Sequence, residues 1–458
     1  MNLPAGRADA SAVPGAGAPV EVRVARPDDL AQAGALTAEA YHADRLLDGD
    51  DEYEVELRDA ERRSREAVLL VAATGDVVVG TLTLAPYGSS YAEVAAPGEA
   101  ELRMLAVAPE VRRRGVAERL VVAALREVVG RGTGRVVLST LDSMHAAHRL
   151  YERLGFVAAP DRDWGHEGVA LRVLTWRAPD APGALVESAT WTPARTVQVD
   201  GWRVGVSAGF TRRANSVLPL GEPADLEAAV RRAEDVLAAE GLPAVFRVCD
   251  AAPTGLDALL DARGYAAVAA TDVLVHDLDG DRAAATVGGT TSATMTTNGT
   301  TAPSGGDDGT RGTRRTAPTS PPRVRVGVAD RPDDVWLDGW LAVKAAAHPV
   351  DRAVPRAVVT GSRALYLTAV DTSGDDAVVG VLRAAFAEDW VGLSCLMVAP
   401  GARRRGIGRL LTERALVAAA ERGARRAFLQ VEVGNVGAAD LYASAGFRPA
   451  ARYHYRQR

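Results

Sequence analysis

Cysteine and long apolar runs are scarce in this chain of 458 residues. Its two cysteines, Cys249 and Cys395, both fall inside apolar runs, which predicts buried thiols of a cytoplasmic protein and neither a disulfide nor a metal site. No apolar run approaches the roughly 18 to 20 residues that span a bilayer, and residues 1–20 have no signal-peptide core. The net charge of −6 lacks the basic excess typical of nucleic-acid binding. We therefore expect neither a nucleic-acid nor a membrane partner.

Two stretches are poor in large apolar residues. Residues 1–19 are rich in Ala, Gly and Pro, and residues 280–322 are dominated by Thr, Gly, Ala, Pro and Ser. Such segments bury too little apolar surface to offset their ordering entropy, so we predict a disordered tail and a disordered Thr/Gly/Pro-rich linker. They delimit three predicted domains: an N-terminal unit (20–178), a middle unit (184–279) and a C-terminal unit (323–458).

The N-terminal and C-terminal units share an internal repeat. A Val-Ala-Pro run begins at Val107 and recurs at Val398, and an Arg-Arg-Arg-Gly run begins at Arg112 and recurs at Arg403. A Leu-Tyr pair and a Gly-Phe pair follow in both copies with the same spacing. The N-terminal copy is longer in the loop around residues 86–100. Repeated motifs at constant spacing indicate two copies of one structural unit.

Each copy reads as an α/β unit with a strand, a turn and an amphipathic helix at its centre. The middle unit repeats this outline but lacks the arginine–glycine turn. Aligning Gly264 with Gly155 puts Leu260 where Tyr151 stands. The middle unit is therefore predicted to be a degenerate, non-catalytic copy.

The arginine–glycine turn is the motif that points to chemistry. The runs from Arg112 to Ala117 and from Arg403 to Gly408 each follow a predicted strand and open a helix. Unpaired backbone N–H groups and the positive end of the helix dipole favour an anion there, and small residues let a pyrophosphate approach closely. The pattern is not a P-loop, because the lysine that follows its second glycine is missing. The alternative is a basic β–α turn that binds nothing; two matched copies favour the anion site.

With this Arg-x-x-Gly-x-Gly/Ala turn and the downstream Leu-Tyr-x-x-x-Gly-Phe helix, the chain resembles the GNAT superfamily of N-acetyltransferases. The resemblance covers about 20–178 and 323–458, and 184–279 only in outline. The layout is similar to that of multi-domain GNAT proteins of actinobacteria. The resemblance implies an α/β fold with a mixed sheet, the acyl-CoA N-acyltransferase fold, in two intact copies and one degenerate copy.

The resemblance also implies that acetyl-CoA binds as the acyl-donor substrate, without a metal, where the fourth and fifth strands of each intact copy separate. In the N-terminal unit its predicted binding residues are Leu105, Val107, Arg112, Arg113, Arg114, Gly115, Val116 and Ala117. In the C-terminal unit they are Met397, Val398, Arg403, Arg404, Arg405, Gly406, Ile407, Gly408 and Asn435. The N-terminal unit departs from the family pattern with Met144 at the position of Asn435.

Acyl transfer to an ammonium group needs a base for its proton and an acid for the departing thiolate. The resemblance assigns the first role to Glu101 and the second to Tyr151 and Tyr442. An exposed strand-end residue is the alternative interpretation of Glu101, and core aromatics are the alternative for the two tyrosines. It also implies that a backbone N–H near Leu105 or Leu396 binds the developing oxyanion.

Two open points concern the C-terminal and middle units. Gly392 stands where Glu101 stands in the N-terminal unit, so the C-terminal copy lacks this base; Glu432 or Asp389 are the candidates to replace it. In the middle unit, Arg212, Arg213 and Asn215 either brace the C-terminal copy or border its acceptor cleft.

The predicted activity is acetyl-CoA-dependent transfer of an acetyl group to a primary amine in a ternary complex. An acyl-enzyme is not expected, because neither cysteine stands in a nucleophile setting. A small-molecule amine is the preferred acceptor, and a protein lysine or N-terminal amine is the alternative. An alternative of another class is a CoA-sensing or scaffolding pseudoenzyme. The sequence predicts no oligomeric state.

Overall fold

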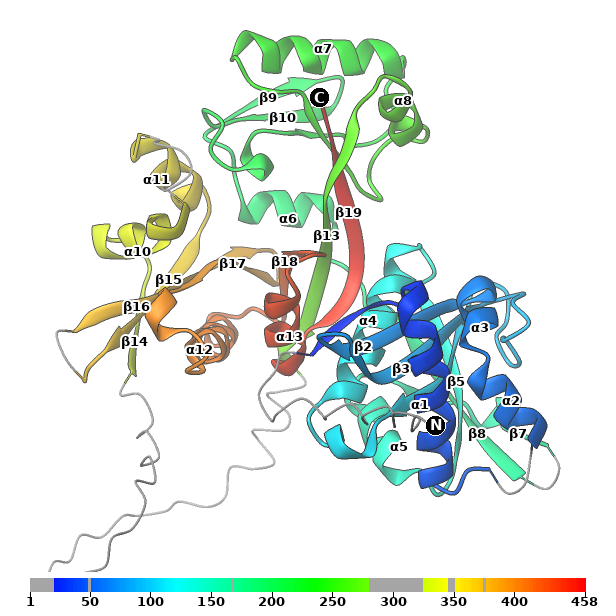
Figure 1. The fold of residues 1–458 in the computed structure, drawn as a ribbon. Helices are drawn as coiled ribbons and strands as arrows, with labels where there is room; N and C mark the ends of the chain where they lie inside the picture. Colours follow the sequence, from blue (N-terminus) through cyan, green and yellow to red (C-terminus); the bar gives the residue numbers. More distant parts are fainter. Residues whose placement is uncertain (1–19, 48–50, 167–168, 280–323, 345–350, 374–375) are drawn as a thin grey trace, which may run out of the picture.

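The structure is a computed structural model that describes residues 20–47, 51–166, 169–279, 324–344, 351–373 and 376–458 (Figure 1). The predicted tail and linker lie outside this part. Within it, the chain has a mixed α/β architecture with two mixed sheets. None of its helices is long and apolar enough to cross a membrane. No cluster of three or more His, Cys, Asp or Glu side chains in these ranges is arranged to hold a metal.

One sheet of eight strands forms the N-terminal unit, in the order β1-β2-β3-β4-β5-β8-β6, with β7 paired to β8. Its strands are β1 (Glu21–Val24), β2 (Val68–Thr74), β3 (Val77–Pro86), β4 (Ala100–Val107), β5 (Arg135–Leu141), β6 (Val157–Ala158), β7 (Trp164–His166) and β8 (Val169–Arg177). Its helices are α1 (Leu30–Ala43), α2 (Asp51–Arg58), α3 (Ala60–Glu66), α4 (Val116–Gly130) and α5 (His145–Arg153), with short 3-10 turns η1 (Pro27–Asp29), η2 (Pro109–Val111) and η3 (Pro160–Arg162). Helices α1 and α4 both pack on β3 and β4, and their buried residues belong to separate apolar clusters.

The other sheet joins the middle and C-terminal units, in the order β14-β15-β16-β17-β18-β13-β19-β12-β11-β10-β9. Its strands are β9 (Arg195–Val199), β10 (Trp202–Val206), β11 (Val217–Leu218), β12 (Val245–Val248), β13 (Ala266–Asp277), β14 (Val324–Ala329), β15 (Ala364–Asp371), β16 (Ala377–Ala387), β17 (Trp390–Val398), β18 (Arg426–Glu432) and β19 (Arg448–Gln457). The helices around it are α6 (Gly183–Thr190), α7 (Leu226–Ala239), α8 (Leu256–Ala262), α10 (Asp334–Lys344), α11 (Ala353–Thr360), α12 (Ile407–Glu421) and α13 (Val436–Ser444), with η4 (Arg212–Ala214) and η5 (Pro400–Ala402).

The last strands of the middle and C-terminal units are exchanged. In the N-terminal unit, β8 returns to pair with β5 of the same unit. In the larger sheet, β13 of the middle unit pairs with β18 of the C-terminal unit, whereas β19 of the C-terminal unit pairs with β12 of the middle unit. The two strands also pair with each other, as the long green and red strands of Figure 1 show. Two units that are separate along the sequence are therefore interlocked in space.

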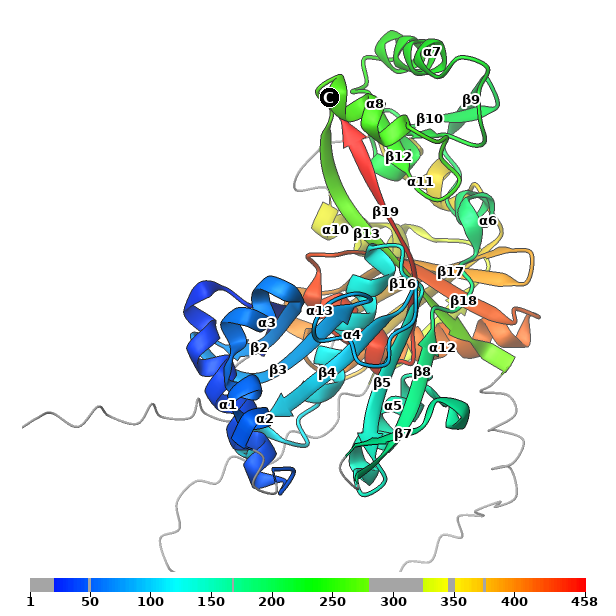
Figure 2. The ribbon, with the colours of Figure 1, turned by 90° about the vertical axis from the view of Figure 1, so that its right-hand side faces the viewer.

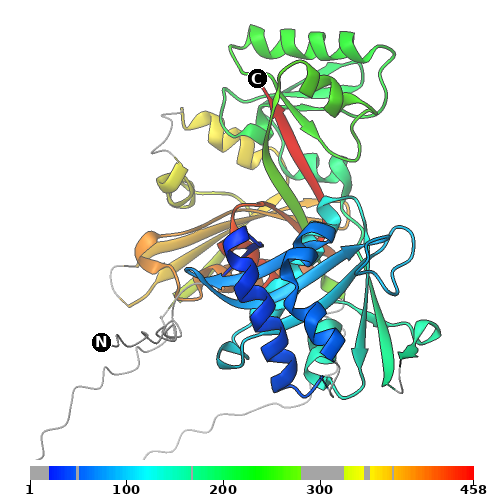
Figure 3. The same cartoon turned by 45° about the vertical axis from the view of Figure 1, so that its right-hand side comes forward.

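The N-terminal unit packs on this exchanged pair through α4, beside β19 (Figure 2). Asp272 of β13 is 1% exposed and lies between two guanidinium groups. Arg126 of α4 donates its Nε–H to the Asp272 carboxylate at 2.5 Å, and Arg452 of β19 donates at 2.6 Å. A carboxylate is removed from water at low cost only when such partners replace the water. This triad therefore fixes the N-terminal unit against the strand exchange. Figure 3 shows the N-terminal unit beside the lower ends of the two exchanged strands.

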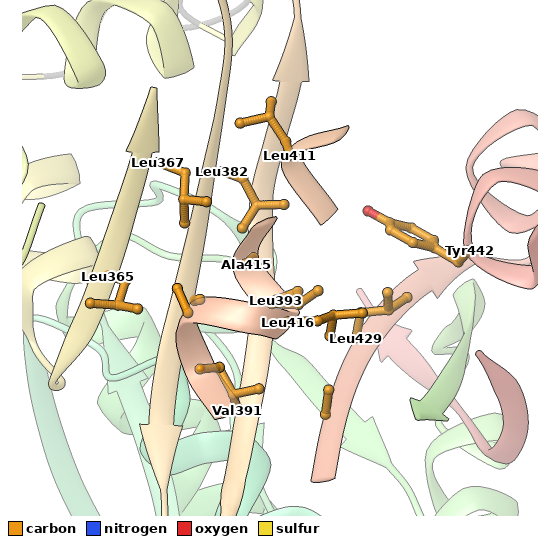
Figure 4. Close-up of a cluster of buried hydrophobic side chains, with 14 of the residues drawn as sticks. Leu365, Leu367, Leu382, Val391, Leu393, Leu411, Ala415, Leu416, Leu429 and Tyr442 are labelled. Carbon is orange, nitrogen blue, oxygen red and sulfur yellow. The ribbon is translucent and has the colours of Figure 1, made fainter. Parts of the chain in front are cut away.

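The core of the C-terminal unit lies between the sheet and α12. Leu411 and Leu416 of α12 pack on Leu367, Leu382 and other strand residues of the same cluster (Figure 4). Helix α13 closes one side, and the side chain of Tyr442 points from it toward α12. The helix that follows the arginine–glycine turn is thus held firmly against the strand that precedes it.

Candidate functional site

The two arginine–glycine turns have the same backbone conformation. Gly115 has φ 78° and ψ 8°, and Gly406 has φ 79° and ψ 3°. A Cβ at either position would meet open space, so the left-handed conformation, and not crowding, favours glycine here. No side chain caps α4 or α12. The first N–H groups of both helices are therefore free to bind an anion.

The first arginine of each turn braces it. Arg112 donates its Nε–H to the carbonyl of Val107 at 3.2 Å, and Arg403 donates to Val398 at 3.3 Å. Arg112 also forms a two-pronged ion pair with Asp44, at 2.6 and 3.0 Å. Arg113, Arg114 and Arg404 are exposed, and Arg405 donates to the Asp371 carboxylate at 2.8 Å. The predicted phosphate-binding residues thus divide into bracing and solvent-facing arginines.

The central strands separate beside each turn. The parallel pairing of β4 with β5 ends at Leu102 and Leu138. The pairing of β17 with β18 ends at the equivalent residues, Leu393 and Leu429. Beyond these pairs each strand continues without its neighbour, so a gap opens at the same place in both units. We call the gap between β17 and β18 the C-terminal mouth.

A β-bulge interrupts the central strand just where it separates. Met104 and Cys395 have φ of 54° and 57°, a conformation uncommon for residues with a side chain. The register shifts there, so that Met104 with Leu105, and Cys395 with Leu396, oppose a single residue of the neighbouring strand. The predicted backbone donors, Leu105 and Leu396, therefore lie in bulges. Sequence reasoning missed the bulges, because nothing in these residue types signals them.

The two tyrosines predicted to act as acids are buried beside the separated strands. Tyr151 is 7% exposed and Tyr442 is 8% exposed. Burial raises the pKa of Tyr442 to about 12 and also raises the pKa of Tyr151. Each ring packs against the phenylalanine of the Gly-Phe pair. The ring centroids are 5.4 Å apart for Tyr151 and Phe156, and 5.9 Å apart for Tyr442 and Phe447. Both phenols therefore stay protonated at neutral pH, as a proton donor must.

Glu101 lies at the base of the 86–100 loop and is 1% exposed. Its Oε2 accepts backbone N–H bonds from Glu93 and Val94 at 2.8 Å and from Ala95 at 3.2 Å. Burial raises the pKa of Glu101, against the opposing effect of these bonds and of Arg103. The carboxylate holds the loop over the strand; its role as a base stays a prediction.

The residue before the last helix differs between the units. Asn435 accepts a hydrogen bond on its Oδ1 from the N–H of Ala438 at 3.2 Å and so caps α13. Met144 stands at the start of α5 and offers no such cap. A Cβ on Gly408 would lie 3.2 Å from Leu441, so α12 and α13 approach closely at this point. Contact of Asn435 with CoA stays a prediction.

The candidate replacements for the missing base lie in different places. Asp389 is in the turn before β17, at the far end from the C-terminal mouth, and its bond to Arg426 lowers its pKa. Glu432 ends β18 at the mouth, 3.8 Å from Arg212 of the middle unit. The side-chain amide of Asn215 forms hydrogen bonds with backbone groups of its own loop, between Ser207 and Thr211.

A cavity of about 760 Å³ lies elsewhere in the C-terminal unit. Arg331, Arg356, Arg363 and Arg422 are among its lining residues, together with the first residues of β15. It opens at the end of the sheet where β17 begins, whereas the arginine–glycine turn follows the other end of β17. It is therefore not part of the site described above.

Two family models match the chain. Residues 36–156 match the model described as "Acetyltransferase (GNAT) family". Residues 309–456 match the model described as "Probable histone acetyltransferase Rv0428c C-terminal". The two matches coincide with the units that carry the arginine–glycine turn, and neither covers the middle unit.

Similar proteins include acetyltransferases. A mycothiol acetyltransferase of Beutenbergia cavernae is 38% identical over 126 residues, which cover 24% of this chain and 41% of that protein. The chain thus matches less than half the length of this relative. The uncharacterized N-acetyltransferase YobR of Bacillus subtilis is 28% identical over 283 residues, 59% of this chain and 94% of that protein.

Two solved structures are similar over larger parts of the chain. A GCN5-related N-acetyltransferase from Kribbella flavida covers 60% of this chain and 96% of its own, with 18% identity and a TM-score of 0.40. Another, from Sphaerobacter thermophilus, covers 96% of this chain and 95% of its own, with 14% identity and a TM-score of 0.30.

Proposed function

Because this chain belongs to the GNAT family of acetyltransferases, we propose that it transfers an acetyl group from acetyl-CoA to a primary amine within a ternary complex, with a small-molecule amine as the preferred acceptor. The family uses acetyl-CoA as its acyl donor. The observation that carries the proposal is the pairing, in both intact units, of an uncapped helix start with a bulged, separated central strand.

The residues of both turns fit the donor substrate. Gly115 and Gly406 open the first turns of α4 and α12, whose free N–H groups suit a pyrophosphate. The exposed arginines of the turns add attraction for the same anion. Acetyl-CoA supplies a thioester when bound, and the separated strands offer it an unpaired edge.

The tyrosines are the proposed general acids that protonate the departing thiolate. The amine nitrogen bonds to the thioester carbon, the carbon–sulfur bond breaks, and the sulfur leaves as a thiolate that must take up a proton. Tyr151 and Tyr442 are neutral phenols on the last helix of each unit and can donate that proton. The N–H groups of Leu105 and Leu396, in the bulges, are the proposed donors to the carbonyl oxygen as it gains charge.

The test is a thiol-release screen with the full chain and acetyl-CoA. Polyamines, amino acids, aminoglycosides and peptides serve as acceptors. We expect release with at least one small amine and an acetylated product by mass spectrometry. Release only with peptides would instead favour the protein lysine or N-terminal acceptor.

A pseudoenzyme that senses CoA or acts as a scaffold is the second candidate. The observations that favour it are the loop bonds that occupy Glu101 and the missing carboxylate at Gly392. In that case no acceptor releases thiol, while CoA still raises the melting temperature.

A further inference from the structure

Helix α6 of the middle unit covers the position where the C-terminal unit lacks its carboxylate. A Cβ on Gly392 would lie 2.9 Å from Oγ1 of Thr190, the last residue of α6. The carbonyl of Thr190 accepts a hydrogen bond from the fully buried Arg383 of β16 at 2.7 Å, which anchors this end of the helix to the C-terminal unit. In the N-terminal unit the 86–100 loop covers Glu101 instead, and the C-terminal unit has only a tight turn between β16 and β17.

Glu187 lies one turn earlier on α6 and faces the C-terminal mouth. It is 4% exposed. Arg247 of β12 donates to its Oε2 at 2.5 Å, and Gln430 of β18 donates to the same oxygen. Gln430 is the first residue of β18 on this face beyond the last pair with β17. Among the described residues no partner is found for Oε1, which leaves one oxygen of a buried carboxylate for a ligand.

Buried polar atoms without a partner gather around this carboxylate. Eight such side-chain atoms occur in the described residues, and five belong to this region: Gln430 Oε1, Ser394 Oγ, Arg247 Nε, Trp191 Nε1 and Thr211 Oγ1. Buried polar groups are normally satisfied, so a cluster of orphans marks a place that a ligand or water completes.

The N-terminal unit supplies the contrast. Arg103 corresponds to Ser394 and pairs with Glu93 at 2.7 Å. Ser139 corresponds to Gln430 and accepts a bond from Trp164 at 3.0 Å. Arg103 and Ser139 at the N-terminal gap therefore already have protein partners, whereas Ser394 Oγ and Gln430 Oε1 at the C-terminal mouth have none among the described residues.

Positive charge exceeds negative charge on this face. Arg247 is balanced by Glu187, and Arg212 lies near Glu432. Arg213 packs over Trp191 at 5.3 Å and pairs with no carboxylate of the described residues. A free guanidinium beside the mouth favours an acceptor that carries an anionic group and disfavours a polycation.

We propose that Glu187 of the middle unit is the catalytic carboxylate of the C-terminal unit, where it binds the ammonium group of a small anionic primary amine and takes its proton. This rests on the proposed acetyl transfer and adds to it a third contributor to the site. The degenerate unit thereby supplies the acceptor side of its neighbour.

The proton balance of the step is complete. The ammonium loses one proton to Glu187 Oε1, the resulting amine attacks the thioester carbon, and the departing sulfur takes the proton of Tyr442. As the amide forms, the attacking nitrogen loses its second proton, which restores the phenol of Tyr442, and the proton on Glu187 passes to solvent. The titratable groups that face Glu187 are Arg247 and Cys249 of the middle unit and Tyr453 and Tyr455 of β19. Arg247 stays charged throughout, because the ion pair with Glu187 and the nearby tyrosines raise its pKa.

The experiment uses the full chain with Glu101→Gln and Tyr151→Phe as a background, which removes the proposed proton-transfer groups of the N-terminal unit. Thiol release is measured with β-alanine, ethanolamine and spermidine. We expect β-alanine to be the best of the three acceptors. Adding Glu187→Gln should lower kcat/KM about 100-fold, the usual contribution of a general base. The rise of kcat/KM with pH that a general base produces should also be lost.

Two further variants separate catalysis from folding. Glu187→Asp keeps the charge and the Arg247 partner but withdraws the carboxylate by one methylene, so kcat should fall while the pH profile keeps its shape. The matched control is Glu234→Gln, which also removes a carboxylate bonded to an arginine of the middle unit, Arg263, away from the mouth. It should leave kcat/KM and the pH profile of the background unchanged.

Several outcomes overturn the inference. If Glu187→Gln left kcat/KM and the pH profile unchanged, the role of Glu187 would be excluded. Should the glutamine variant fail to fold, an unchanged kcat in Glu187→Asp would exclude that role instead. Preference for spermidine would exclude the anionic acceptor. If the background variant with Glu101→Gln and Tyr151→Phe were inactive while the wild-type chain was active, all turnover would belong to the N-terminal unit. A wild-type chain inactive with every amine would instead remove the proposed function itself, and the inference with it.

Discussion

At the scale of single residues, the buried tyrosines carry the most direct prediction. Replacing Tyr442 or Tyr151 with phenylalanine removes the proposed proton donor but keeps the ring that packs on Phe447 or Phe156. We expect turnover to fall by about 100-fold in the unit concerned, with little change in CoA affinity. Thiol-release kinetics and calorimetry of CoA binding measure the two quantities. If both single variants and the double variant turned over as fast as the wild type, the phenols would have only a packing role.

The same tyrosines predict an alkaline limit to stability. Burial raises the pKa of Tyr442 to about 12, whereas an unfolded tyrosine titrates near 10. A raised pKa in the folded state gives stability that is complete below pH 10 and is lost as the pH rises from about 10 to 12. The loss is about 1.4 kcal/mol per pH unit for such a tyrosine. Urea unfolding from pH 9 to 11.5 should show a shallower decline for Tyr442→Phe than for the wild type; parallel declines would contradict the assignment.

Single residues also show where sequence reasoning stops. The glycines at 115 and 406 could be placed in a helix-opening turn because glycine has a known backbone preference. Met104 and Cys395 adopt positive φ without any such preference, so their bulges follow from the separation of the strands, which is a tertiary effect. Glu187 could not be found either, since α6 is near Gly392 only in the folded chain.

At the scale of elements, the turn that opens α12 predicts that alanine substitutions at two nearby glycines, Gly406 and Gly401, affect CoA affinity differently. Gly406→Ala forces an alanine into the left-handed region at a cost of about 1 kcal/mol or more, which favours a shift of the backbone whose N–H groups form the proposed anion site. We expect the CoA affinity of the C-terminal unit to fall at least about tenfold. Calorimetry should then resolve one weakened site and one unchanged site.

Gly401 provides the matched control for this turn. It lies in η5, just before the arginines, has no positive φ, and a Cβ there meets open space. Gly401→Ala should therefore bind CoA as the wild type does. Equal affinities of the two alanine variants would mean that the turn does not hold the pyrophosphate.

The elements that were predictable are the ones with local signals. The strand–turn–helix of both intact units follows from apolar patterning and from the Arg-Gly run. The pairing partner of β13 does not, because β13 pairs with residues of β18 and β19 that lie 149 or more positions away along the chain. An apolar strand pattern indicates a strand but not its neighbour.

At the scale of the whole molecule, the strand exchange makes the middle unit a structural requirement of the C-terminal unit. Without β13, the outer edge of β18 loses its hydrogen-bonding partner along the seven residues from Arg426 to Glu432. Without β12, the end of β19 beyond Arg452 has no sheet to join. A fragment of residues 323–458 therefore exposes an apolar edge that favours aggregation.

We accordingly expect residues 181–458 to fold and bind CoA, residues 1–180 to bind CoA separately, and residues 323–458 alone to be insoluble or to melt without cooperativity. Co-expression of residues 181–279 with 323–458 should recover a soluble pair, since the exchanged strands can form between two chains. Light scattering, circular dichroism melts and calorimetry with CoA distinguish these states. A monomeric, cooperatively folded 323–458 would show that the C-terminal unit can close its sheet with its own last strand. The middle unit would then be free to diverge, and its retention beside Gly392 would need a reason other than folding, which the carboxylate of Glu187 provides.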